Sequence, residues 1–143
     1  MDKNSFFART MHTPDSPERA KLRETLRETS RALIPLHKRL IEAAKSDYAF
    51  AYEAETTPAQ LLNLLQSDPF FAWLKPLTAI IVDVDEMART DFEPAQALAI
   101  AARLERLFAE QQYVEMLQRE VDVAISHAAL RRTLQQLTSG SGQ

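Results

Sequence analysis

The sequence predicts an all-α protein, folded as a bundle of four to five helices. Apolar residues recur every three or four positions along most of the chain, which is the spacing of one face of an α-helix. The strong helix formers Ala, Leu, Glu, Gln and Arg dominate the composition. The only glycines are Gly140 and Gly142, so the sequence lacks the Asn-Gly and Asp-Gly pairs that make tight β-hairpins.

The chain has the length and composition of one folded domain. Of its 143 residues, 45% are hydrophobic and 26% are charged, which is typical of globular proteins. Residues 1–16 show no helical periodicity, and we expect them to form a flexible arm. The bundle is predicted over residues 17–137, and a disordered tail over residues 138–143.

The first helix is predicted to begin at Pro17, because two good capping residues, Asp and Ser, precede it and proline is tolerated in a first helical turn. Its apolar stripe predicts an end near residues 50–52. Pro35 lies inside this stripe, where proline removes an amide donor and crowds the carbonyl group of Arg31. A kink or break is therefore predicted near Pro35.

The next three helices are each predicted to begin at a proline that follows a capping residue: Pro58, Pro69 and Pro94. The helix from Pro69 should run to about Arg89 and contain a second kink or break near Pro76.

The stripe that follows Pro94 continues to residue 137. As one helix it would be roughly 65 Å long, too long for a compact domain of this size. We therefore expect a break near residues 120–123, with Asp122 as the cap of a fifth helix.

The charges are distributed unevenly. Residues 17–45 contain eight basic and four acidic side chains, whereas residues 46–115 contain four basic and twelve acidic ones. A nucleic-acid partner would need the basic segment as a phosphate-binding helix. The net charge of −3 and the absence of interleaved aromatic residues favour complementary faces within the bundle or across a dimer instead. We expect no nucleic-acid partner.

Other classes of protein are disfavoured by missing patterns. No apolar run approaches the roughly 20 residues of a membrane helix, and no export signal is evident, so we expect a cytoplasmic protein without a membrane partner. The sequence lacks cysteine, Glu-x-x-His pairs, Gly-x-Ser-x-Gly and glycine-rich loops. We therefore predict no metal, no cofactor and no enzymatic activity.

Two groups of residues are nevertheless candidates for a catalytic or ligand-binding role. His37 lies on the apolar stripe of the first helix, where it is either a haem ligand or, as is more typical, a hydrogen-bonded core residue. Asp83 and Glu86 share a helix face and could form an acid–base pair or a cation site. A solvated face explains the same spacing, with Asp85 placed to pair with Arg89 one turn later.

Residues 61–77, LLNLLQSDPFFAWLKPL, resemble segments of small bacterial all-helical proteins of unknown function. The resemblance implies a helical fold and a bacterial origin. It implies no activity, cofactor or ligand.

We predict a non-catalytic helical interaction module, either a homodimer or an adaptor for another bacterial protein. Phe71 is the candidate partner contact, since an α-helix from Pro69 would point it away from Phe70 and Trp73; burial of the whole segment is the alternative. The alternative function is a small-molecule or cofactor-binding bundle. Its pocket would lie near the proline kinks and be lined by His37, Tyr48, Trp73 or Tyr113.

Overall fold

The computed structural model describes residues 15–141, which form six α-helices and one 3₁₀ helix and contain no strand. The helices are α2 (Pro17–Tyr52), α3 (Pro58–Ser67), the 3₁₀ helix η1 (Pro69–Leu74), α4 (Lys75–Arg89), α5 (Pro94–Phe108), α6 (Gln111–Arg119) and α7 (Val121–Ser141). The all-α prediction is confirmed, with one helix more than expected.

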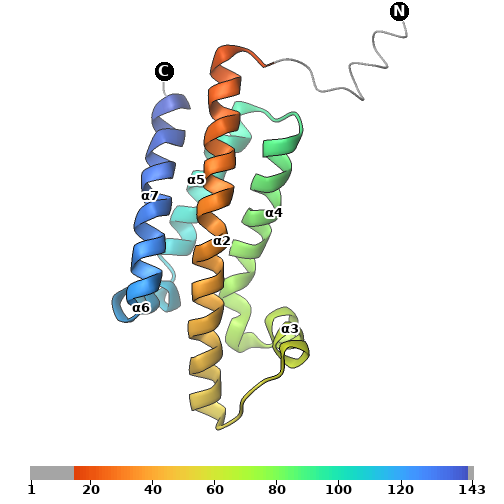
Figure 1. Ribbon diagram of the computed structural model, residues 1–143, viewed down its shortest axis with the longest axis vertical. Helices are drawn as coiled ribbons and strands as arrows, with labels where there is room; N and C mark the ends of the chain where they lie inside the picture. The colour runs from red at the N-terminus through yellow and green to blue at the C-terminus, as the bar shows by residue number, and fades with distance from the viewer. Residues whose placement is uncertain (1–14, 142–143) are drawn as a thin grey trace, which may run out of the picture.

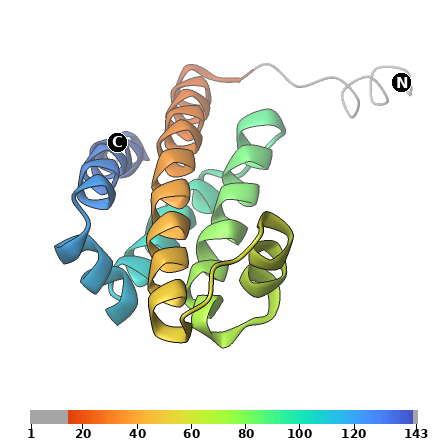
Figure 2. The same cartoon turned by 60° about the horizontal axis from the view of Figure 1, so that its bottom comes forward.

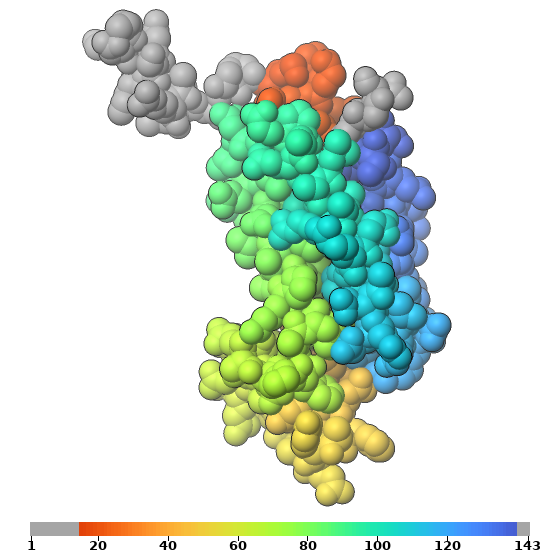
Figure 3. All heavy atoms as spheres, turned by 180° about the vertical axis from the view of Figure 1, so that it is seen from behind, coloured from red at the N-terminus to blue at the C-terminus, as the bar shows by residue number. Residues whose placement is uncertain are grey.

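The long helix α2 organises the bundle. It packs against α7 on one side and α4 on the other, and α5 packs against both α4 and α7 (Figure 1). The short helices α3 and α6 lie at the same end of the bundle, on opposite sides of α2 (Figures 1 and 2). Seen from behind, α5 covers the face between α4 and α7 (Figure 3).

One apolar core runs along the bundle. Every described helix except α3 contributes buried side chains to it, while Leu61, Leu64 and Leu65 of α3 pack against it half-buried. The largest fully buried side chains are Tyr113, Phe71, Leu26, Leu33, Leu36, Leu40, Leu77, Ile80, Ile100, Leu104, Leu130 and Leu137. This core is what holds the long helices in place.

The predicted helix starts are confirmed. Helices begin at Pro17, Pro58, Pro69 and Pro94, where the missing proline amide costs nothing because first-turn amides have no helical partner. Near Pro76 the helix changes from 3₁₀ to α geometry at Lys75, as a break there predicts.

Of the kink or break predicted near Pro35, the break is wrong. Helix α2 continues through Pro35 from Pro17 to Tyr52, and it ends where Glu53 adopts a left-handed conformation with φ of 51°. Pro35 faces solvent, while α4 and α7 hold α2 along its buried face. Tertiary packing therefore outweighs the lost backbone hydrogen bond.

The C-terminal half differs from the prediction in three ways. The break at Glu120 is confirmed, but a second break at residues 109–110 separates α5 from α6. Asp122 does not cap a helix, because α7 begins one residue earlier and Asp122 lies in its first turn. The predicted tail is helical over residues 138–141, and residues 142–143 lie outside the described part.

At the other end, Asp15 and Ser16 belong to the folded domain rather than to the predicted arm. Ser16 accepts a hydrogen bond from the Arg19 amide at 3.1 Å and caps α2. The Asp15 carboxylate pairs with Arg23 at 2.8 Å. Residues 1–14 lie outside the described part.

Candidate functional site

A groove of about 500 Å³ lies between α2, α3 and α4. It is lined by six apolar residues and four polar ones: Ile41, Leu62, Leu65, Leu74, Ala79 and Val82, with His37, Gln66, Lys75 and Thr78. This volume is within the range of sites that bind small molecules or side chains of a partner.

Helix α3 forms one wall of this groove, and local hydrogen bonds hold both of its ends. At its start, the Gln60 amide donates to Thr57 Oγ1 at 3.2 Å, and the Thr57 amide donates to Gln60 Oε1 at 2.9 Å. At its end, the Asp68 amide donates to the Leu64 carbonyl oxygen at 2.9 Å, and Asp68 Oδ1 accepts from the Phe70 amide at 2.8 Å, which caps η1. Leu61, Leu64 and Leu65 also pack half-buried against the core, so caps and partial burial together hold the short helix.

The burial of α3 is unusually low for its sequence. It carries four leucines, yet none of its residues is buried, and Leu62 is 57% exposed. Helix α4, by comparison, buries Leu77, Ile80, Val84 and Ala88. Full burial of a leucine side chain stabilises a protein by about 1.5–3 kcal/mol. Because the leucines of α3 are only partly buried in a single copy of the chain, they contribute only part of this stabilisation.

Two more exposed aliphatic side chains lie beside the groove. Val82 of α4 lines it and is 58% exposed. Ile34 of α2 is 58% exposed and lies on the same helix face as His37 and Ile41, three and seven residues later. We call the groove together with Ile34 the groove face. An apolar patch with polar residues around it is typical of a binding surface.

His37 joins α2 to α4 within the groove. Its Nε2 lies 3.3 Å from Thr78 Oγ1, and the ring is half-buried. Burial lowers the pKa of His37 below its ordinary value of 6.5, so the ring is mostly neutral at pH 7. Of the two roles considered for His37, the hydrogen-bonded one matches this geometry. Residues 15–141 contain no group of three or more His, Asp and Glu side chains arranged to hold a metal ion.

Lys75 is the one charged side chain that lines the groove. It is exposed, and it forms no ion pair with any residue in the described part of the chain. The groove lining therefore has a positive charge at one end and no acidic group to balance it.

Tyr48 lies outside the groove, in an aromatic cluster that packs the end of α2 on η1. Its ring centroid is 4.7 Å from that of Tyr52 and 5.5 Å from those of Phe70 and Phe71. The cluster fixes the position of η1, and through it the start of α4.

The prediction that Phe71 contacts a partner is wrong for this fold, because its side chain has no exposed surface. The reason is the local helix type. In a 3₁₀ helix, residues three apart lie in one row, so Phe71 and Leu74 both face the core. The α-helical spacing assumed from the sequence turned Phe70 and Trp73 inward instead, and these two are half-buried.

Trp73 lines a different cavity, of about 470 Å³, together with Pro76, Arg103 and Arg106. This cavity lies between η1, α4 and α5, whereas the groove lies between α2, α3 and α4. Both are close to Pro76, but His37 and Trp73 line separate spaces. The structure does not bring the four predicted pocket residues together.

Tyr113 is buried at the corner of α5, α6 and α7. Its hydroxyl oxygen lies 2.7 Å from His127 Nδ1, and both rings contact Phe108. Burial raises the pKa of Tyr113, and burial followed by the charge of Arg131 lowers the pKa of His127. Both rings are thus mostly neutral at pH 7, and a hydrogen bond joins the Tyr113 hydroxyl to Nδ1. The pair ties α6 to α7.

The acidic cluster on α4 behaves as a solvated face. Asp85 pairs with Arg89 at 2.9 Å, as predicted, and Asp83 pairs with Arg103 of α5 at 2.7 Å. Glu86 is exposed and forms no ion pair with any described residue. Asp83 and Glu86 are therefore not an isolated acid–base pair.

Sequence reasoning missed the role of Arg23, which was read as part of a basic stripe. Its side chain is almost fully buried and donates to the carbonyl oxygens of Met87, Ala88 and Thr90 at 3.1, 3.2 and 2.7 Å. Arg19 donates to the Phe92 carbonyl oxygen, and both guanidinium groups lie about 5 Å from the Phe92 ring. No local signal in the sequence could reveal partners more than sixty residues away.

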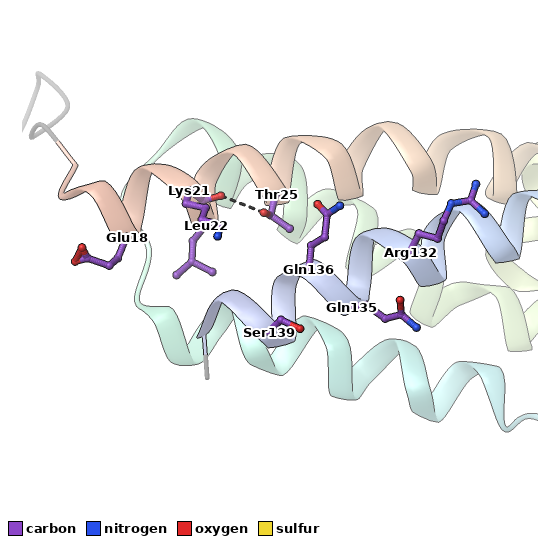
Figure 4. A pocket seen from close by; sticks show the side chains of 8 residues that line it. All are labelled: Glu18, Lys21, Leu22, Thr25, Arg132, Gln135, Gln136 and Ser139. Carbon is purple, nitrogen blue, oxygen red and sulfur yellow. Dashed lines mark hydrogen bonds between the residues drawn. The ribbon is translucent and has the colours of Figure 1, made fainter. Parts of the chain in front are cut away.

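A larger cavity of about 870 Å³ lies between the first turns of α2 and the last turns of α7. Figure 4 shows side chains of both helices around it, and Thr25 donates within α2 to the Lys21 carbonyl oxygen at 3.1 Å. Its lining is mostly polar and contains both Glu18 and Lys21. Leu22 is the one apolar residue among its lining residues, whereas six of the ten groove residues are apolar.

Comparisons with protein families, with curated proteins and with solved structures find no match to this chain. The helical fold implied by residues 61–77 is confirmed, and the bacterial origin stays a prediction. None of the described helices combines the length and the apolar character that crossing a membrane requires.

Proposed function

We propose that this chain is a helical interaction module that self-associates through the groove face. The observation that carries the proposal is the burial of α3: four leucines on one short helix, and none of its residues buried. Leu62, Ile34 and Val82, each 57–58% exposed, form with the half-buried Leu65 an apolar area that one copy leaves in contact with water.

A second copy provides a suitable cover for this area. A two-fold dimer places the same patch of each subunit against the other, so the apolar side chains of the face are covered on both subunits. The charged groups around the face, such as Lys75 and Glu86, then form a polar rim. Rim charges mainly steer association, while the apolar centre supplies most of the affinity.

The test is the molar mass of charge-insertion variants, measured by light scattering at micromolar concentration. We expect Val82→Glu and Leu62→Glu to shift the protein from dimer to monomer, because each places a carboxylate in the apolar centre. The matched control is Ile125→Glu, since Ile125 is 64% exposed on α7, away from the groove. A dimer that survives both groove variants but is lost in Ile125→Glu would contradict the proposed surface.

The second candidate function is the binding of a small apolar molecule with an anionic group. The groove volume and the unpaired Lys75 at its end favour it. Native mass spectrometry of the protein with decanoate, an aliphatic carboxylate, tests this candidate. One bound molecule per chain, lost when Ala79→Trp fills the groove, would support it, and an unchanged mass would remove it.

A further inference from the structure

We infer that the second copy packs with its α4 antiparallel to the first, so that Lys75 of each subunit meets Glu86 of the partner subunit. This inference rests on the proposed self-association and adds the register of the interface. The observation behind it is a self-complementary pattern of charge and size on the exposed face of α4.

Four exposed residues form this pattern: Lys75, Ala79, Val82 and Glu86. Their spacing of four, three and four residues places them on one helix face. Lys75 and Glu86 are eleven residues apart, which is about three turns or roughly 16 Å along the axis. The stripe thus begins with a positive charge, ends with a negative charge, and has two apolar residues between.

The charges at the two ends of the stripe are available. Neither Lys75 nor Glu86 forms an ion pair with another residue in 15–141. The other two acids of the cluster are already engaged, Asp83 with Arg103 and Asp85 with Arg89.

A two-fold axis midway along the stripe gives each of the four residues a complementary residue on the partner subunit. It places Lys75 opposite Glu86 of the partner subunit, twice, and Ala79 opposite Val82 of the partner subunit, twice. The small Ala79 side chain leaves room for the larger Val82, which is the size alternation that packed helices use. The apolar pair lies at the centre and the charges lie at the rim.

Other arrangements of the same helix are disfavoured by like charges. Parallel packing about a two-fold axis places Lys75 against Lys75 and Glu86 against Glu86 of the partner subunit. An antiparallel register centred on Val82 places Lys75 against Arg89 of the partner subunit. Like-charge contacts of this kind select one register from several with similar apolar contact.

The other apolar residues of the groove face enlarge the apolar contact around Ala79 and Val82. Helices α2 and α4 run antiparallel (Figure 1), and His37 contacts Thr78. Ile34 lies one turn before His37 on α2, and Val82 lies one turn after Thr78 on α4. Because the two helices run in opposite directions, Ile34 and Val82 lie at the same level along the bundle. Leu62 of α3 lines the groove together with Lys75 and Ala79.

The test is a pair of charge reversals, Lys75→Glu and Glu86→Lys, analysed alone and mixed by sedimentation velocity. Each variant alone has two like-charge contacts in this register, and we expect its dimer Kd to rise roughly tenfold at low salt. In an equimolar mixture, one subunit carries two carboxylates and the other two lysines. The mixed dimer regains both ion pairs, so its Kd should return to within about threefold of the wild-type value.

The matched control is Lys21→Glu, the same charge change on an exposed α2 residue beside the large cavity, and its Kd should equal that of the wild type. A wild-type dimer whose Kd is unchanged by both reversals, or a mixture that does not recover, overturns the register while the proposed self-association stands. A monomeric wild-type protein overturns both. Circular dichroism of each variant is the check that the exposed substitutions leave the fold intact.

Discussion

The guanidinium group of Arg23 donates a hydrogen bond to the Thr90 carbonyl oxygen at 2.7 Å, across the gap between α2 and the end of α4. The last carbonyl groups of a helix have no helical partner, and Arg23 satisfies three in this region. The same group pairs through two nitrogens with Asp15, at 2.8 and 3.2 Å. One side chain thus fixes the start of α2, the end of α4 and the loop that leads to α5.

Substitution of Arg23 should therefore be costly. We expect Arg23→Met to lower the free energy of unfolding by about 3 kcal/mol, because it removes the donor that three carbonyl groups share and the cation paired with Asp15. Urea denaturation followed by circular dichroism measures the change. The control is Arg27→Gln, whose exposed pair with Glu24 should contribute less than about 1 kcal/mol. Equal effects of the two substitutions would show that Arg23 does not hold this end of the bundle.

Substitution of Pro35, in contrast, should raise the stability of the protein. Since α2 is continuous and residue 35 faces solvent, Pro35→Ala should restore an amide donor for Arg31 and raise the free energy of unfolding by about 1–3 kcal/mol. Pro76→Ala is the control, because Pro76 lies in the first turn of α4, where proline is tolerated. Thermal unfolding compares the stability of the two variants. Destabilisation by Pro35→Ala would contradict the claim that Pro35 costs the continuous helix a backbone hydrogen bond.

The hydrogen bond between Tyr113 and His127 predicts a pH dependence. The pKa of His127 in the folded state lies below its ordinary value of 6.5, so the unfolded chain binds the proton more tightly. This contribution to stability is complete above about pH 6.5 and is lost as the pH falls through the folded-state pKa. His37 has a pKa shift in the same direction.

We accordingly expect the urea midpoint to fall between pH 7.5 and pH 5.5 in the wild-type protein. The fall should be smaller in His127→Asn, whose side-chain amide does not titrate and can still form a hydrogen bond with Tyr113. A midpoint that stays constant or rises on acidification would contradict burial of neutral His127.

Local stability should be lowest in α3. Its backbone is held by the Thr57 capping box and by no buried side chain, so its amides should exchange with deuterium faster than those of α4. Hydrogen exchange at two protein concentrations measures this directly. If the groove face is the dimer interface, protection of residues 58–67 should increase with concentration, while that of α6 should not. Slow, concentration-independent exchange in α3 would contradict this assignment.

Most of the fold could be predicted from the sequence, because caps and prolines are local signals. Pro17, Pro58, Pro69 and Pro94 each begin a helix. The 3₁₀ geometry of η1 has no such signal, since it depends on how Phe71 and Leu74 pack against the core, and this is why Phe71 was misassigned. The uninterrupted course of α2 through Pro35 likewise depends on its neighbours.

The candidate site could be predicted only in part. His37 was identified from its place on an apolar stripe, and it does line the groove. Lys75, Val82 and Leu62 were not, because nothing local marks an exposed aliphatic residue as part of a surface. That surface exists only once α3 lies beside α2 and α4, which requires the turn at residues 53–57 and the position of η1.

The most direct test of this account is the molar mass of the wild-type protein in solution, by light scattering from about 1 to 100 µM. We predict about twice the 16.2 kDa of one chain, both at low salt and at about 0.5 M salt, where the Debye length is only a few ångströms. An apolar interface with rim charges should weaken only modestly over that range. A mass of one chain at every concentration and salt would contradict self-association.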